Sequence, residues 1–221
     1  LKKCVLELGG SNAFIILEDA NLEKAVEKAV NARMQNAGQS CIAAKRFLVH
    51  EKIVDEFVAK FKVAIQNLKT GNPLDKETQI GSLARVDLAE ELELQVQKSI
   101  QMGAKLIVGG NGKDAFYEPT ILTNVTTEMP VFKEETFGPV AAIITFKTIE
   151  EAIKLSNQSE FGLGVSIFTQ DIDFIKTKIP SFNEGAFFIN DMVKSDPRLP
   201  FGGIKKSGYG RELAEDGIKE F

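Results

Sequence analysis

The sequence predicts an α/β fold in which helices flank a largely parallel β-sheet. Two observations lead to this prediction. Short apolar segments that end at Gly, Pro or Asn alternate along the chain with longer segments whose apolar residues recur every three or four positions. Such alternation is typical of strand–helix–strand units with parallel strands. No internal repeat or low-complexity segment interrupts it, so we expect residues 1–221 to form one domain without a linker.

The predicted strands are short, apolar and bounded by turn residues. They cover residues 5–8, 46–50, 104–108, 141–146, 164–169 and 185–189. The first of them is expected to be buried, because it consists of apolar residues around a single charge and ends at a Gly-Gly turn.

The predicted helices have apolar residues at helical spacing. The first begins at Leu22, with Asp19 or Asn21 as its N-cap and Gly38 as its stop. The others cover residues 54–68, 87–102, 149–157 and 172–179.

Composition excludes several classes of protein. The 27 Lys and Arg against 31 Asp and Glu indicate no nucleic-acid partner, and no apolar segment approaches the ~20 residues of a membrane span. Two cysteines are too few for a disulfide scaffold and predict a reducing, cytoplasmic setting. No signal peptide can be read. The chain enters an apolar run almost at once and stops without a polar tail, so both ends look cut through ordered structure and we expect a part of a longer protein.

Cys41 is the candidate nucleophile. It follows Gly38, and Ser40 can cap a short helical turn over residues 41–44. Backbone N–H groups in a first turn would favour the thiolate and could stabilise an oxyanion. The alternative is a small buried hydrophobic residue. Because Cys4 begins a strand that we expect to be buried, Cys41 should be alkylated faster than Cys4.

Glu7 is the candidate general base, because burial in an apolar strand would raise its pKa. The alternative is an edge strand on which Glu7 faces water. Glu134 and Glu135 are adjacent in an extended segment and point to opposite faces, so at most one serves a site. His50 ends a strand and is expected at the surface. No cluster has the spacing of metal ligands, and no glycine-rich stretch forms a dinucleotide fingerprint.

Four segments together resemble the NAD(P)-dependent aldehyde dehydrogenase superfamily, in the order and spacing of its catalytic domain. They are Leu6-Glu7-Leu8-Gly9-Gly10, Asn36-Ala37-Gly38-Gln39-Ser40-Cys41, Glu134-Glu135-Thr136-Phe137-Gly138-Pro139-Val140 and Pro200-Phe201-Gly202-Gly203-Ile204-Lys205-Lys206-Ser207-Gly208. Within the superfamily, residues 44–49 and Ser195-Asp196 resemble bacterial succinate-semialdehyde dehydrogenases. The resemblance covers essentially the whole chain and corresponds to the second half of such an enzyme.

The resemblance implies a role for each matching residue. Cys41 is the nucleophile that adds to an aldehyde, and Glu7 is the base that activates water for thioester hydrolysis. Glu135 and Phe137 hold the nicotinamide riboside of NAD or NADP, and Phe201 is an aromatic residue of the substrate pocket. The full-length protein is expected to be a homo-oligomer, a dimer or tetramer.

Departures from the family pattern refine these expectations. Most of the coenzyme-binding domain and the C-terminal strand that joins subunits are missing from this sequence, so the chain alone is expected to bind NAD or NADP weakly and to be inactive. Ala43 stands where some members carry a second cysteine. Gln35 stands where an arginine can bind a substrate carboxylate, so Arg33 and Ser195 become the candidates for that role.

Two other classes of function remain open at this stage. One is a cysteine-dependent hydrolase or acyl transferase that needs no nicotinamide cofactor. The other is a non-enzymatic module for oligomerisation or binding.

Overall fold

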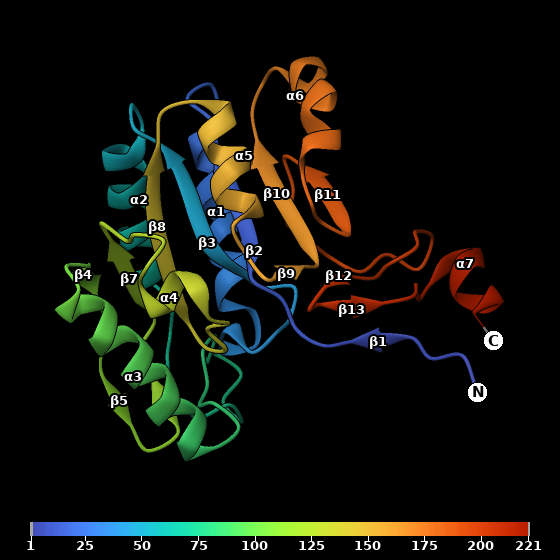
Figure 1. The fold of residues 1–221 in the computed structure, drawn as a ribbon. Coiled ribbons are helices and arrows are strands. Elements are labelled where there is room, and N and C mark those ends of the chain that lie inside the picture. The colour runs from blue at the N-terminus through green and yellow to red at the C-terminus, as the bar shows by residue number, and fades with distance from the viewer. Residues whose placement is uncertain (1, 221) are drawn as a thin grey trace.

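The computed structural model describes residues 2–220, and in them seven strands form a central sheet (Figure 1). The strand order is β11-β10-β2-β3-β8-β7-β4, and every neighbouring pair is parallel except β4 with β7. The strands are β2 (Asn12–Ile16), β3 (Ala44–His50), β4 (Lys105–Val108), β7 (Thr120–Thr123), β8 (Val140–Phe146), β10 (Gly164–Phe168) and β11 (Ala186–Ile189). The prediction of an α/β fold with a largely parallel sheet is confirmed.

Helices cover both faces of the sheet. On β3, the ring of Phe47 lies 5.4 Å from that of Phe61 in α2 (Val54–Gln66), which packs beside α1 (Leu22–Met34). The next side chain, Arg46, points to the opposite face and donates to carbonyl oxygens of α5 (Ile149–Asn157). The other helices are α3 (Val86–Gln101), α4 (Pro130–Lys133), α6 (Ile172–Lys178) and α7 (Ala214–Lys219), with 3-10 turns at Gln35–Gly38 and Ile179–Ser181. Across residues 2–220, none of the helices is both long and apolar enough to span a membrane.

The strand order determines where the connecting loops meet. The chain moves from β2 through α1 to β3 in one direction, and from β10 through α6 to β11 in the other. Because β2, β3, β8 and β10 are parallel, the loops that precede them gather at the end of the sheet where these strands begin. Cys41 and Glu135 both lie in these loops.

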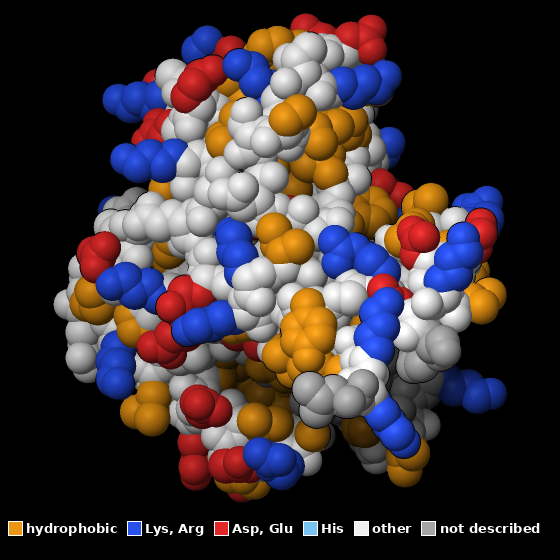
Figure 2. All heavy atoms as spheres, turned by 45° about the vertical axis from the view of Figure 1, so that its right-hand side comes forward, with side chains coloured by type: hydrophobic (Ala, Val, Ile, Leu, Met, Phe, Trp, Pro, Cys, Tyr) orange, Lys and Arg blue, Asp and Glu red, His pale blue; other side chains and the backbone are white. Residues whose placement is uncertain are grey.

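A strand forms within residues 5–8, as predicted, but the prediction that it is buried is wrong. β1 (Leu6–Glu7) pairs with β13 (Gly208–Tyr209) in a separate two-stranded ribbon, beside which β12 (Ile204–Lys205) pairs with β9 (Phe161–Gly162). Leu6 is 36% and Leu8 59% exposed, so the apolar side chains of this segment are not buried. Figure 2 brings this side forward and shows apolar surface between charged side chains.

The strand that the sheet uses instead is β2, which the sequence analysis did not predict. All of its residues are buried, as are those of the predicted strands β3 and β10. β7 was also not predicted, nor was the small hairpin of β5 (Gly112–Lys113) and β6 (Phe116–Tyr117).

At the opposite end of the sheet, one sequence expectation is confirmed and one is wrong. Asn21 is the N-cap of α1, because its side chain accepts from the Lys24 N–H at 3.0 Å, whereas Asp19 accepts hydrogen bonds from Thr169. His50 was expected at the surface but is buried, with Nε2 3.0 Å from the Lys147 carbonyl oxygen. It ends a central strand, and the turn after β8 covers it.

Candidate active site

Three loops meet where the parallel strands begin. The Gly10 N–H, before β2, donates to Glu135 Oε1, before β8, at 2.9 Å. A Cβ on Gly10 would lie 2.7 Å from the carbonyl oxygen of Cys41, before β3. Segments that are far apart in the sequence therefore form one site around the candidate nucleophile.

Cys41 does not lie in a helix, which corrects the expectation of a helical first turn. The Ala43 N–H donates to the Ser40 carbonyl at 3.2 Å, and β3 begins at once at Ala44, so the turn cannot continue as a helix. Burial is the main cause that raises the pKa of the half-buried Cys41 thiol. The Lys45 ammonium and the Ile42 N–H act in the opposite direction.

Cys4 is exposed, so both reasons for expecting faster alkylation of Cys41 are absent from the structure. The premise for Cys4 was a buried strand, and the premise for Cys41 was a helix terminus. Neither feature is present among the described residues.

Glu7 lies on the ribbon beside this site. Its Oε1 accepts from the Gly203 N–H at 3.3 Å, and its Oε2 is buried without a hydrogen-bond partner in the described chain. Burial raises the pKa of Glu7 and Glu212 adds to the effect, whereas the Gly203 bond and Arg211 lower it. The Glu7 carboxylate also raises the pKa of the Cys41 thiol, as a smaller cause than burial.

Glu134 and Glu135 point to different parts of the molecule, as their adjacency predicts. Glu134 accepts from the Gln95 side chain of α3 at 2.9 Å. Glu135 faces the Cys41 loop, where its Oε1 lies 3.5 Å from Lys45 Nζ. Phe137, two residues later, has a side chain that is 38% exposed.

Arg33 cannot bind a substrate carboxylate, which corrects the sequence-based expectation. Its side chain is fully buried, and it donates to the carbonyl oxygens of Gly38 at 2.6 Å, Ala44 at 3.0 Å and Thr136 at 3.4 Å. The guanidinium therefore holds the backbone on both sides of Cys41 through these hydrogen bonds. Ser195, the other candidate for this role, is exposed.

A small apolar cluster adjoins the nucleophile. Phe201, 7% exposed, packs there with Leu163 and Val193. Cys41 itself is one of the partly buried residues against this cluster. The structure thus places the predicted pocket aromatic beside the candidate nucleophile.

Lys45 is a site residue that the sequence analysis did not identify. It is the second residue of β3, its side chain is fully buried, and its Nζ contacts both Glu135 and the Cys41 carbonyl. The signal available was the pair of charged residues Lys45 and Arg46 inside the otherwise apolar run of 43–49, shortly after the candidate cysteine.

Comparison with known proteins decides the family. A model described as "Aldehyde dehydrogenase family" matches residues 1–221. The chain belongs to the aldehyde dehydrogenase family. The resemblance seen in the sequence motifs is thereby confirmed.

Relatives within the aldehyde dehydrogenase family include enzymes named for one substrate. The chain is 51% identical over 224 residues to succinate semialdehyde dehydrogenase (NAD(P)+) Sad of Escherichia coli strain K12, covering 100% of the chain and 48% of that protein. It is 50% identical to a probable succinate-semialdehyde dehydrogenase (NADP+) of Synechocystis, covering 49% of that protein. The crystal structure of succinate-semialdehyde dehydrogenase from Burkholderia pseudomallei matches with a TM-score of 0.97 and 38% identity, over 100% of the chain and 46% of that structure. The chain spans about half the length of the curated relatives it matches.

The aldehyde dehydrogenase family implies a nicotinamide cofactor, and the residues before β8 fit its nicotinamide end. Glu135 Oε2 lies so close to Gly9 that a Cβ at that position would be 2.6 Å from it. Within residues 2–220, this oxygen receives no hydrogen bond. This oxygen can accept from a ribose hydroxyl. The half-exposed Phe137 ring offers an apolar face nearby.

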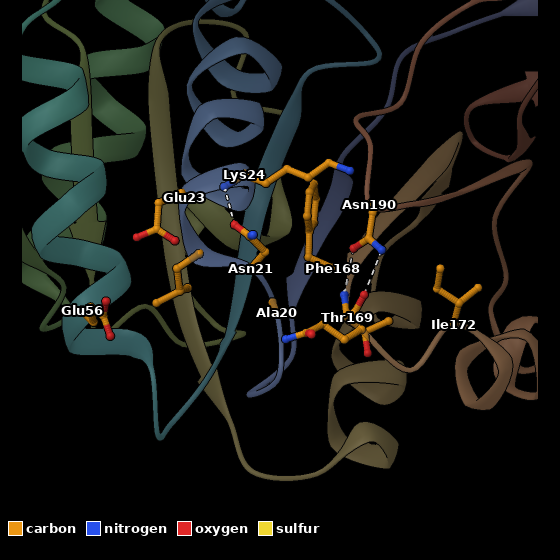
Figure 3. A pocket seen from close by; sticks show the side chains of 11 residues that line it. Ala20, Asn21, Glu23, Lys24, Glu56, Phe168, Thr169, Ile172 and Asn190 are labelled. Carbon is orange, nitrogen blue, oxygen red and sulfur yellow. Dashed lines mark hydrogen bonds between the residues drawn. The ribbon is translucent and has the colours of Figure 1, made fainter.

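A second cleft, of about 620 Å³, lies at the opposite end of this aldehyde dehydrogenase sheet (Figure 3). It is lined by the residues just before and at the start of α1, by the end of β10 and the loop after it, and by single residues of α2 and α6. Its polar side chains bond to nearby backbone, since Asn190 bonds to both the N–H and the carbonyl of Thr169, and Asn21 caps α1. Among the described residues it brings no reactive group together with Cys41.

Proposed function

We propose that the whole protein carrying this chain oxidises an aldehyde to a carboxylic acid with NAD(P)+, and that succinate semialdehyde is its substrate. The family and the names of the relatives support this proposal. The observation that carries it is the arrangement around Phe201: Cys41 packs against the apolar cluster that contains Phe201, and the Gly203 N–H, two residues later, donates to the Glu7 carboxylate.

These two residues divide the chemistry between them. The Cys41 thiolate adds to the aldehyde carbon and forms a thiohemiacetal. Bound NAD(P)+ supplies the hydride acceptor for oxidation of this adduct to a thioester. Glu7 then takes a proton from water, which attacks the thioester and releases the acid and the thiolate. The unpartnered Oε2 of Glu7 is the atom suited to accept that proton.

The neighbouring residues bind and orient the reactants. Glu135 and Phe137 hold the nicotinamide riboside, and Phe201 forms an apolar wall of the aldehyde pocket. In the proposal, Ser195 donates its hydroxyl to the free carboxylate of succinate semialdehyde. Ser195 lies in the exposed loop that leads to Phe201, which is compatible with contact to a bound substrate.

We also propose that the whole protein is a homo-oligomer. β11 lies at the edge of the sheet and pairs only with β10 within the described residues. Light scattering of the whole protein tests this, and a monomeric mass would contradict it.

The function is tested by following NAD(P)H absorbance with succinate semialdehyde and with butanal, an uncharged aldehyde of similar length. We expect Cys41→Ser to abolish the signal. Cys4→Ser is the matched control, because Cys4 is exposed and outside the site. Hydrolysis of an ester without cofactor as the sole activity would favour a hydrolase or acyl transferase, and the absence of both activities would favour a binding module.

A further inference from the structure

The Lys45 side chain is enclosed by oxygen atoms. Its Nζ lies 3.1 Å from the Ser40 carbonyl oxygen, 3.3 Å from those of Cys41 and Ala43, and 3.5 Å from Glu135 Oε1. A neutral amine has two N–H donors and an ammonium has three. Three carbonyl acceptors and a carboxylate therefore favour the ammonium form, although the side chain is fully buried.

The charges around this ammonium do not balance. Arg33 is also buried under the loop, so two cations face the single carboxylate of Glu135. Burial and the nearby Arg33 lower the pKa of Lys45 to about 7, whereas Glu135 and Cys41 raise it. Removal of charges from water is costly unless they are compensated, so a further anion at this place would stabilise the cluster.

We propose that Lys45 is a positioning residue that stabilises the Cys41 thiolate, and that this thiolate is the counter-charge that the buried cation cluster lacks. Ionisation of the thiol releases one proton from Sγ and leaves a negative charge at the end of the loop whose carbonyl oxygens surround the ammonium. The inference rests on the proposed function, in which Cys41 is the nucleophile. It explains how a half-buried thiol can ionise although no helix terminus lies beside it to stabilise the thiolate.

Three groups other than Lys45 act on the ionisation of Cys41. Glu7 from β1 and Glu135 from the loop before β8 both raise the pKa of the thiol, and the Ile42 N–H lowers it. Glu135 thus competes with Cys41 for Lys45. Removal of the Lys45 charge and removal of the Glu135 charge must therefore move the ionisation of Cys41 in opposite directions.

The test measures the pH dependence of Cys41 alkylation by iodoacetamide in the whole protein, with mass spectrometry of the peptide that contains Cys41. It needs no turnover, so its failure is distinguishable from failure of the proposed function. We expect Lys45→Met to raise the apparent pKa of Cys41 by about one unit, which slows alkylation at pH 7 about tenfold while the rate at high pH recovers. Glu135→Gln should lower the apparent pKa and accelerate alkylation at pH 7.

A purely structural role of Lys45 gives a different pattern. Lys45→Met would then change the alkylation rate equally at all pH values and leave the apparent pKa in place, which would overturn the proposal. Lys45→Arg, which keeps the charge, should preserve the pKa better than Lys45→Met. If Lys45→Met does not fold, Glu135→Gln still decides, because an unchanged or raised apparent pKa in that variant contradicts the proposal.

Discussion

The guanidinium of Arg33 donates to the carbonyl oxygen of Gly38 at 2.6 Å, and this contact fixes the chain between the end of α1 and Cys41. The helix ends at Met34, and two left-handed residues, Asn36 and Ala37, turn the backbone toward the site. After this turn, the buried cation donates to the carbonyl oxygens of Gly38 and of Ala44, on either side of Cys41. Its function is to shape the Cys41 loop and not to bind substrate.

Replacement of Arg33 tests this assignment. Arg33→Met leaves buried carbonyl oxygens without donors, so we expect a loss of about 3 kcal/mol in the free energy of unfolding. Activity should fall equally for succinate semialdehyde and butanal. Urea unfolding and kcat/KM with both aldehydes measure these effects. Arg85→Gln, at an exposed ion pair with Asp87, is the matched control and should change little. A selective loss for succinate semialdehyde would restore the substrate-binding role.

Gly38 is required by its surroundings as well as by its backbone angle. Its φ is +76°, and a Cβ would lie 2.3 Å from the Gly138 carbonyl oxygen. Gly103, with φ +110° and open space around it, is the matched control. We expect Gly103→Ala to cost about 1 kcal/mol of stability from the backbone angle alone. Gly38→Ala should cost clearly more and should slow the alkylation of Cys41, and equal costs for both variants would contradict the account.

Glu7 gives the deacylation step a distinctive pH dependence. Burial raises its pKa above the ordinary 4.5, and the deprotonated form is the base, so thioester hydrolysis should fall as pH drops through the raised value. Glu212→Gln removes a repulsive charge and should move this fall to lower pH. Glu7→Gln should slow hydrolysis more than acylation. Burst kinetics separate the two steps, and loss of the burst with unchanged turnover would contradict the assignment.

Phe137 and Phe132 distinguish cofactor binding from core packing. Phe137 is 38% exposed, so Phe137→Ala should raise the KM for NAD(P)+ about tenfold while the melting temperature stays nearly constant. Phe132 is 1% exposed, and Phe132→Ala should cost about 3–5 kcal/mol of stability. Thermal unfolding together with cofactor titration measures both effects. A large drop in melting temperature for Phe137→Ala would show that its ring supports the fold.

The sequence was sufficient to predict most of the sheet and helices. Amphipathic spacing located α1, α2, α3, α5 and α6, since their buried apolar residues belong to the hydrophobic core. β2 was missed although its apolar run is buried at every residue, as those of the predicted strands β3 and β10 are. β1 was given its place because a leucine-rich segment looks buried from composition alone.

The sequence indicated candidate residues for the site but not their electrostatics. Motif order identified Cys41, Glu7 and Glu135, but local sequence suggested a helix terminus at Cys41 because Ser40 is a good cap. The start of β3 at Ala44 prevents that helix, and a lysine from the strand supplies the positive charge instead. Most arginines lie at the protein surface. Only the tertiary structure reveals that Arg33 is buried and donates to three carbonyl oxygens.

The central claim, that Cys41 forms the covalent intermediate and Glu7 resolves it, is tested most directly by trapping that intermediate. Whole protein carrying Glu7→Gln is mixed with succinate semialdehyde and NAD(P)+, quenched in acid and digested for mass spectrometry. The account predicts a succinyl group on the peptide that contains Cys41, in larger amount than in the unsubstituted protein. Turnover without any adduct on Cys41, or an adduct on another residue, would contradict it.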